Sequence, residues 1–232
     1  MKIIVTDLTR FNNQDVCIAG ICPDTGACIR PLPYLSKAEC RERNILPGEI
    51  LAGQFTPSRC SRPHVEDHSW KNRDFCGPCS SATFRNILAE SATESVEDGF
   101  SVRIPRGQKY IPTETPPNTS IITLRIDPRG WQILRDRYNK VKVHLRENSG
   151  REFQYVPITD LGLYEYVMSH VADDGALGRL NDFLCSQREV FIRVGLGREY
   201  RVPDRGRGFW IQVNGIYTFP ECFKDIRCHW RG

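Results

Sequence analysis

Residues 190–220 read VFIRVGLGREYRVPDRGRGFWIQVNGIYTFP and predict two long strands joined by an arginine-rich loop. In the first strand Ile192, Val194 and Leu196 recur at a spacing of two, which places Arg193 on the opposite face. The second strand alternates aliphatic residues with an aromatic ring and two amides, on Trp210, Gln212 and Asn214. One face of this hairpin is therefore expected to pack against a core, while the other carries aromatic and polar side chains.

The second strand is interrupted at Asn214-Gly215. Glycine inside a strand often marks a β-bulge or a close approach of two backbones. The alternation therefore does not decide which way Tyr217 and Phe219 face.

The connecting loop concentrates positive charge. The chain has a net charge of +4, and the whole excess lies in residues 117–232. Arginines outnumber acids by five to two between residues 193 and 207. A basic loop beside a partly aromatic sheet face is typical of a single-stranded nucleic-acid surface, although many arginine-rich loops serve only solubility. The residues predicted to bind nucleic acid here are Arg193, Arg198, Arg201, Arg205, Arg207, Trp210, Gln212 and Asn214.

The N-terminal part reads as a meander of short strands at residues 2–9, 15–23 and 27–35, with a turn at the sequence PDTG (23–26). Arg30 lies on the third of these strands, where it either reaches a phosphate or a base, or pairs with a nearby acid. Ser36 followed by Glu39 has the spacing of a capping box, which predicts a helix over 36–43.

Residues 101–117 run into a proline-rich connector, so we place a domain boundary at residue 116. Arg103, Arg106 and Lys109 beside Tyr110 form a second basic and aromatic cluster. In the second half we expect a strand at 120–127, a short helix at 131–140 and a hairpin over 142–158. Thr159 or Asp160 is expected to cap a helix, and a further helix covers 177–184.

The segments FIRVGLGREY and WIQVNGIYTFP resemble the C-terminal signature of the dual OB-fold domain family of prokaryotes. The opening MKIIVTDLTRFNNQDVCIAGICPDTGACIRPLP resembles its N-terminal signature, and PHVED (63–67) is a weaker match. The resemblance implies two small OB-like barrels with short helices, in residues 1–116 and 117–232. It also implies nucleic-acid binding, with protein partners, in a prokaryotic conflict or defence system. Many short strands with helices between them agree with such a mostly β fold.

Residues 56–100 are richer in Cys, His and Ser and lose the strand alternation, which we interpret as an insertion in the first domain. Cys76 and Cys79 form a CxxC pair, and Cys60 and His64 lie upstream. Such residues are zinc ligands, but the spacing matches no common zinc finger. A structural zinc site and a metal-free insert both remain open, and the metal-free interpretation is favoured.

The same segment contains His64-Val-Glu66 before the CxxC pair, a pattern of zinc deaminases. Only nine residues separate Glu66 from Cys76, too few for the strand and helix that a deaminase needs there. His64, Glu66 and Asp67 therefore read either as a loop that bonds to its own neighbours or as a divalent-ion site. The second alternative leaves open an enzyme or a small-nucleotide sensor, with or without a metal.

The composition is that of a soluble globular protein: 232 residues, 40% hydrophobic and 26% charged. The sequence contains no run of about 18 apolar residues and no secretory hydrophobic region near its start, so we expect a cytoplasmic protein without a membrane span. Its ten cysteines are then expected to be reduced thiols.

No Ser-His-Asp or Cys-His catalytic set can be assigned from the sequence. The favoured hypothesis is a nucleic-acid-binding module without catalysis of its own. The enzyme or nucleotide sensor and a pure protein-interaction module are the alternatives. DNA or RNA preference, the identity of a partner and the oligomeric state stay open.

Overall fold

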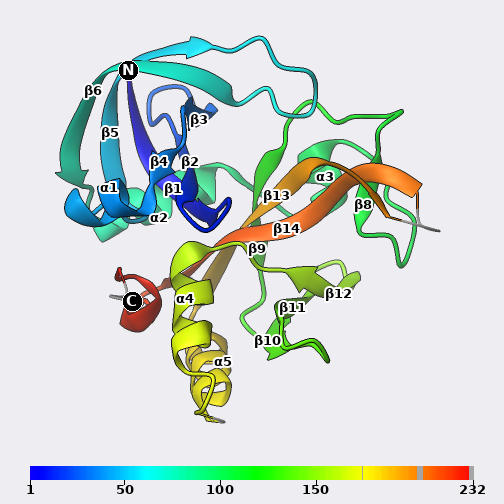
Figure 1. Ribbon diagram of the computed structural model, residues 1–232. Helices are drawn as coiled ribbons and strands as arrows, with labels where there is room; N and C mark the ends of the chain where they lie inside the picture. Colours follow the sequence, from blue (N-terminus) through cyan, green and yellow to red (C-terminus); the bar gives the residue numbers. More distant parts are fainter. Residues whose placement is uncertain (174, 203–205, 230–232) are drawn as a thin grey trace.

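The computed structural model describes residues 1–173, 175–202 and 206–229 (Figure 1). Strands account for 45% of the residues and helices for 20%, and the sheets are curled. The prediction of a mostly β fold with short helices is confirmed. The strands form one six-stranded, one five-stranded and one three-stranded sheet.

The first sheet contains β1 (Lys2–Arg10), β2 (Asp15–Ile21), β3 (Cys28–Leu32), β4 (Leu35–Ser36), β5 (Glu49–Pro57) and β6 (Asp67–Pro78). β1 pairs with both β2 and β5, and β6 pairs with both β5 and β3, so the pairings run in a ring. Every pair in this ring is antiparallel except β3 with β6, which is parallel. Helix α1 (Lys37–Glu42) separates the β1–β3 meander from the β5–β6 hairpin, and Ser36 caps it as the sequence predicts.

The five-stranded sheet has the order β7 (Ala92–Thr93), β9 (Ile121–Ile126), β13 (Glu189–Val202), β14 (Gly206–Phe219), β8 (Tyr110–Pro112). The three-stranded sheet is a meander of β10 (Trp131–Arg135), β11 (Val141–Arg146) and β12 (Glu152–Pro157). Helices α4 (Leu161–Ser169) and α5 (Ala176–Ser186) follow this meander and precede the β13–β14 hairpin. A parallel bridge from Ile158 to Val213 joins the end of the meander to β14.

The two halves thus repeat one order of elements: a meander, a helical segment, then a hairpin whose second strand runs parallel to the end of the meander. Helices α2 (Ser81–Glu90) and α3 (Val96–Phe100) lie between the halves in sequence, and the turn η1 (Lys224–Ile226) follows the last strand. β7 and β8 precede the boundary expected at residue 116, yet they pair with β9 and β14 of the second half.

Two local expectations differ from the structure. Residues 131–135 form strand β10 instead of a helix, because Trp131, Ile133 and the paired β11 bury one alternating face. Residues 67–78, inside the expected insertion, form β6, a strand paired on both edges. Most of its outward positions are polar, and a bulge opposite β5 breaks the alternation that would reveal it.

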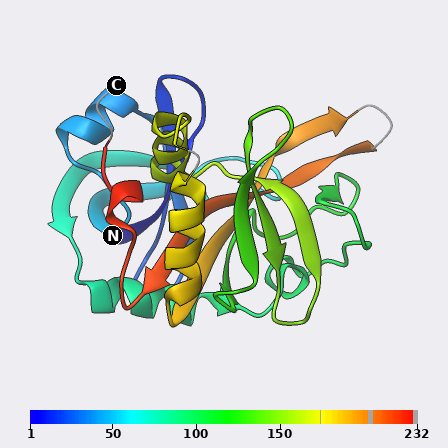
Figure 2. The ribbon, with the colours of Figure 1, turned by 90° about the horizontal axis from the view of Figure 1, so that it is seen from below.

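The β13–β14 hairpin belongs to two cores at once, and its long strands cross the molecule in Figures 1 and 2. Its aliphatic face, including Ile192, Val194 and Ile211, packs in the core of the second half. Its other face places Phe191, Tyr217 and Phe219 against Ile4 and Ile21 of the first sheet and against α2. Both faces of the hairpin are therefore buried near Phe191 and Tyr217, whereas the sequence pattern predicts only one buried face.

The interruption at Asn214-Gly215 is a register shift, as the sequence suggests. Arg193 lies opposite Gly215 while the next residue, Val194, lies opposite Val213. Asn214 is the extra residue. Its side chain lies so close to Gly195 that a Cβ there would meet it at 2.3 Å, so Gly195 is required for the strands to approach.

A buried ion pair connects the halves. The Arg193 side chain is 2% exposed and its Nε donates to Asp7 Oδ2 at 2.9 Å. The same guanidinium donates to Thr123 Oγ1 at 2.7 Å and contacts Cys28 Sγ at 3.2 Å. Because a buried charge is costly without its partner, Asp7 and Arg193 depend on each other.

Asp7→Asn is expected to lower the free energy of unfolding by about 3–5 kcal/mol, because it leaves the Arg193 charge buried without its counter-ion. Urea unfolding followed by fluorescence measures this. Glu199→Gln is the matched control: it breaks the exposed pair with Arg207 and is expected to cost less than about 1 kcal/mol. Equal stabilities for the two variants would contradict the role of the Asp7–Arg193 pair.

Candidate nucleic-acid interface

Two of the predicted phosphate-binding arginines lie inside the protein. Arg193 makes the ion pair with Asp7, and Arg30 donates to Asp67 while only 6% exposed. For Arg30 the structure thus selects pairing with a nearby acid. Neither arginine is available to a phosphate, because each is buried and paired with a carboxylate. Arg193 is buried because the first half covers its face of the hairpin, and the alternation of the strand cannot reveal a second buried face.

The remaining hairpin arginines differ in exposure. Arg198 is half exposed and donates to Asp67 Oδ2 at 2.9 Å. Arg207 is exposed and pairs with Glu199 at 2.5 Å, and Arg201 is exposed. Arg205 lies outside the described residues. The described part of the loop therefore offers Arg201 and Arg207 to solvent, together with Tyr200, which is 63% exposed.

A cleft of about 700 Å³ opens at the edge of β14. The backbone of residues 109–112 runs along β14 from Gly208 to Ile211, and residues 158–159 run along it at Val213. The cleft lies between these two segments, where residues 109–112 leave the edge of β14 and before residues 158–159 reach it. It is lined by Gly107, Gln108, Lys109, Tyr110, Glu152, Phe153, Gln154, Tyr155 and Trp210.

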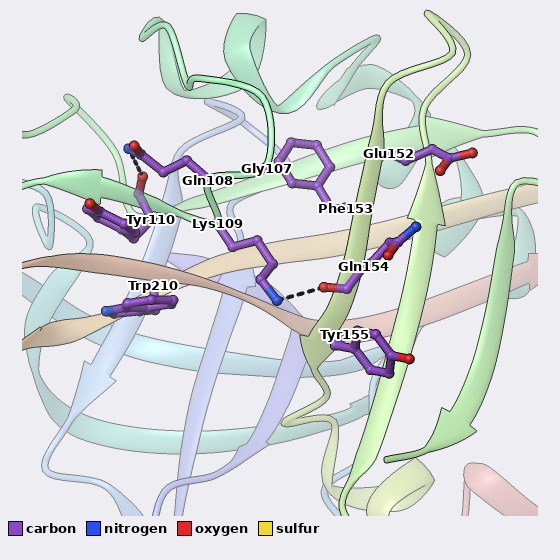
Figure 3. Close-up of a pocket in the computed structure, with 9 residues that line it drawn as sticks. All are labelled: Gly107, Gln108, Lys109, Tyr110, Glu152, Phe153, Gln154, Tyr155 and Trp210. Atoms are coloured by element: carbon purple, nitrogen blue, oxygen red, sulfur yellow. Dashed lines mark hydrogen bonds between the residues drawn. The ribbon is translucent and has the colours of Figure 1, made fainter. Parts of the chain in front are cut away.

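Aromatic rings occupy both sides of this cleft (Figure 3). Trp210 and Tyr110 are direct cross-strand neighbours with ring centroids 4.9 Å apart. Tyr155 is 47% exposed on the opposite side and meets His144 edge-on at 4.6 Å. Between them the Lys109 Nζ donates to the Gln154 carbonyl at 2.8 Å. The cleft thus combines one exposed and two half-buried aromatic rings with an ammonium group.

A bulge in β12 produces the wall of the cleft. Val143 pairs with Val156 but Leu145 pairs with Phe153, so Gln154 and Tyr155 together lie opposite His144. Tyr155 has a left-handed φ of 55°. A regular strand would send adjacent side chains to opposite faces, whereas here both Gln154 and Tyr155 are exposed.

A second hollow of about 230 Å³ lies on the other side of the same wall. Glu152 and Gln154 line both cavities. The second hollow adds mainly basic and polar side chains, those of Arg129, Gln132, His144 and Arg146. The cleft and the hollow therefore adjoin at Glu152 and Gln154 of β12, and together they are called the strip below.

The structure brings Trp210 of the predicted set to this cleft and adds Lys109 and Tyr110 of the weaker predicted cluster. Gln212 and Asn214 lie deeper along β14, where Gln212 Nε2 and Thr159 Oγ1 both donate to Asn214 Oδ1. Tyr155, Glu152 and Gln154 also line the cleft and are not among the residues predicted from the sequence. The alternation in residues 152–157 signals an outward face, but only the bulge places Tyr155 on it.

His64, Glu66 and Asp67 are all buried, and each carboxylate has a structural partner. Glu66 accepts hydrogen bonds from the Ser120 backbone N–H at 2.6 Å and from its hydroxyl at 2.7 Å, at the entry to β9. Burial alone would raise the pKa of Asp67, but hydrogen bonds and charge from Arg30 and Arg198 outweigh it and hold the pKa low. The geometry is that of a loop fixed to its neighbours.

The predicted zinc ligands do not converge. Cys76 is exposed on β6, where its thiol contacts Asp74, and the Cys60 thiol donates to the His64 carbonyl at 2.8 Å. Across residues 1–173, 175–202 and 206–229, no three His, Cys, Asp or Glu side chains form a group that could hold a metal ion. Burial raises the pKa of the Cys79 thiol.

No protein-family model matches this sequence. A search of curated proteins also found no match. Within the part of the chain that the structure describes, no helix is long and apolar enough to cross a membrane.

Burial, together with the positive charges of Arg198 and Arg30, lowers the pKa of His64 to about 3. Folded His64 then stays neutral while an unfolded histidine takes up a proton near pH 6.5. Because the unfolded state binds more protons, stability is expected to fall as the pH drops below about 6.5, by at most about 1.4 kcal/mol per pH unit for this group.

Urea unfolding of the parent and His64→Asn between pH 7 and pH 5 measures this effect. The parent is expected to lose stability faster than the variant as the pH falls. Parallel curves would show that His64 takes up its proton at the same pH in the folded and the unfolded protein, and would contradict the lowered pKa.

Proposed function

We propose that this protein binds single-stranded DNA or RNA along the strip formed by the cleft and the adjacent hollow. The observation that carries the proposal is the cleft itself, in which Trp210 with Tyr110 and Tyr155 present aromatic faces beside Lys109. Nucleobases stack on such rings regardless of their sequence, and only unpaired bases have free faces.

The fold supports this proposal. In each half a meander, a helical segment and a hairpin follow one another, with one parallel contact between meander and hairpin. This order of elements is similar to that of a five-stranded Greek-key barrel of the OB type, and on this likeness we propose that both halves are OB-like. In that fold, ligands bind over the second and third strands, which correspond here to β11 and β12.

Exposed cations line the hollow and lie on the neighbouring hairpin. Arg129 and Arg146 line the hollow, while Arg201 and Arg207 lie on the hairpin that carries Trp210. These groups can contact phosphates while bases stack in the cleft, which predicts a salt-dependent affinity.

The resemblance of both chain ends to the dual OB-fold family supports a biological setting for this binding. We propose a module of a prokaryotic conflict or defence system that works with protein partners and has no catalysis of its own. Cytoplasmic localisation belongs to the same proposal.

Tyr155→Ala is expected to weaken binding of a single-stranded oligonucleotide by about 1–3 kcal/mol, the usual worth of one stacked base. Because Tyr155 is 47% exposed, the melting temperature should change little. Fluorescence anisotropy at several salt concentrations measures affinity, and the slope of log K against log salt should stay near that of the parent. Phe11→Ala is the matched control, since it removes a similarly exposed ring from the first half.

The double substitution Arg201→Ala with Arg207→Ala should act differently from Tyr155→Ala, reducing the salt slope by about 0.7 for each lost phosphate contact.

If Tyr155→Ala binds as tightly as the parent, or no more weakly than Phe11→Ala, the cleft is not the binding site. A duplex of the same sequence should bind more weakly than the single strand, because its bases are already stacked.

A further inference from the structure

Glu152 is an unusual residue for a nucleic-acid surface because its carboxylate repels phosphates. It lies on the wall between the cleft and the hollow and lines both. A nucleic-acid backbone is therefore disfavoured directly over Glu152, whereas a hydrogen-bond donor of a base is favoured there.

Arg146 lies directly opposite Glu152 in the β11–β12 ladder. Side chains in this relation have Cβ atoms about 4.5–5.5 Å apart. Although their charges are opposite, they form no ion pair, and among the described residues neither charged group has a hydrogen-bond or ion-pair partner. A carboxylate and a guanidinium thus stand side by side at the edge of the hollow with both available to a ligand.

From this geometry we propose that the hollow selects guanine. The Watson–Crick edge of guanine offers N1–H and N2–H₂ as adjacent donors, which a carboxylate can accept together. Next to them lie O6 and N7, the acceptor pair that arginine binds with two hydrogen bonds. Guanine therefore matches Glu152 and Arg146 at the same time.

The other bases satisfy the pair less well. Cytosine and adenine each offer the carboxylate one exocyclic amine, and thymine or uracil offers only N3–H. The N1–H of guanine is engaged in duplex pairing, so this recognition also requires a single strand. The inference rests on the proposed function, since it assigns a base preference to the same strip.

The test uses labelled thymidine oligonucleotides with one central guanine, adenine, cytosine or inosine, and the corresponding uridine RNA series, in fluorescence anisotropy. A single guanine is expected to lower the Kd about tenfold relative to the all-thymidine or all-uridine probe. Inosine, which lacks the N2 amine, should lose most of that gain. Glu152→Gln should remove the guanine preference while all-thymidine binding stays equal or becomes tighter.

Glu90→Gln is the control, because Glu90 is exposed at the end of α2 in a different part of the protein. It should keep the guanine preference. Arg146→Gln should reduce both that preference and the salt slope. Equal binding of all probes, or a guanine preference that survives Glu152→Gln, would overturn this inference and leave the proposed function standing. Absence of binding to every probe would overturn both.

Discussion

The structure depends on the β13–β14 hairpin, which contributes side chains to two hydrophobic cores. The aliphatic face of β13–β14 completes the second half, and its other face carries Phe191 and Tyr217 into contact with the first sheet. Arg193 lies on that second face, and its charge is tolerated there because Asp7 neutralises it and Thr123 accepts a further hydrogen bond. Both halves therefore pack against the same pair of strands. The strand register in one half consequently constrains the strand register in the other.

The candidate site follows from the same hairpin. One end of β14 is buried between the halves. At the other end, residues 109–112 run along the edge of β14 that does not pair with β13. Where that neighbour leaves, the edge opens into the cleft, and Trp210 lies there with Tyr110. The bulge in β12 then supplies the opposite wall by turning Tyr155 outward. One end of β14 therefore packs in both cores, and the other end lines the cleft proposed as the binding site.

The sequence predicts local features well where one short-range interaction decides them. Ser36 caps α1 and Asp160 caps α4, because a side-chain oxygen needs only the backbone three residues ahead. The long hairpin and its bulge at Asn214 are also confirmed. The role of Arg193 could not be predicted, because its partner Asp7 lies 186 residues away in sequence.

The same limit on prediction from the sequence applies to the cleft. Lys109, Tyr110 and Trp210 are each visible in the sequence as basic or aromatic residues, but their meeting depends on the pairing of β8 with β14. Tyr155 depends on a bulge that no glycine marks. Strand β6, inside the segment interpreted as an insertion, is not predicted for a related reason, since a bulge against β5 hides its strand pattern.

Native-state hydrogen exchange in increasing urea tests the shared hairpin most directly. If β13–β14 serves both cores, the slowest amides of β1, β9 and β13 should exchange only through one global unfolding event, with the same free energy and the same urea dependence. Exchange of the β1–β6 amides at a distinctly lower free energy, while β9 and β13 stay protected, would contradict this account.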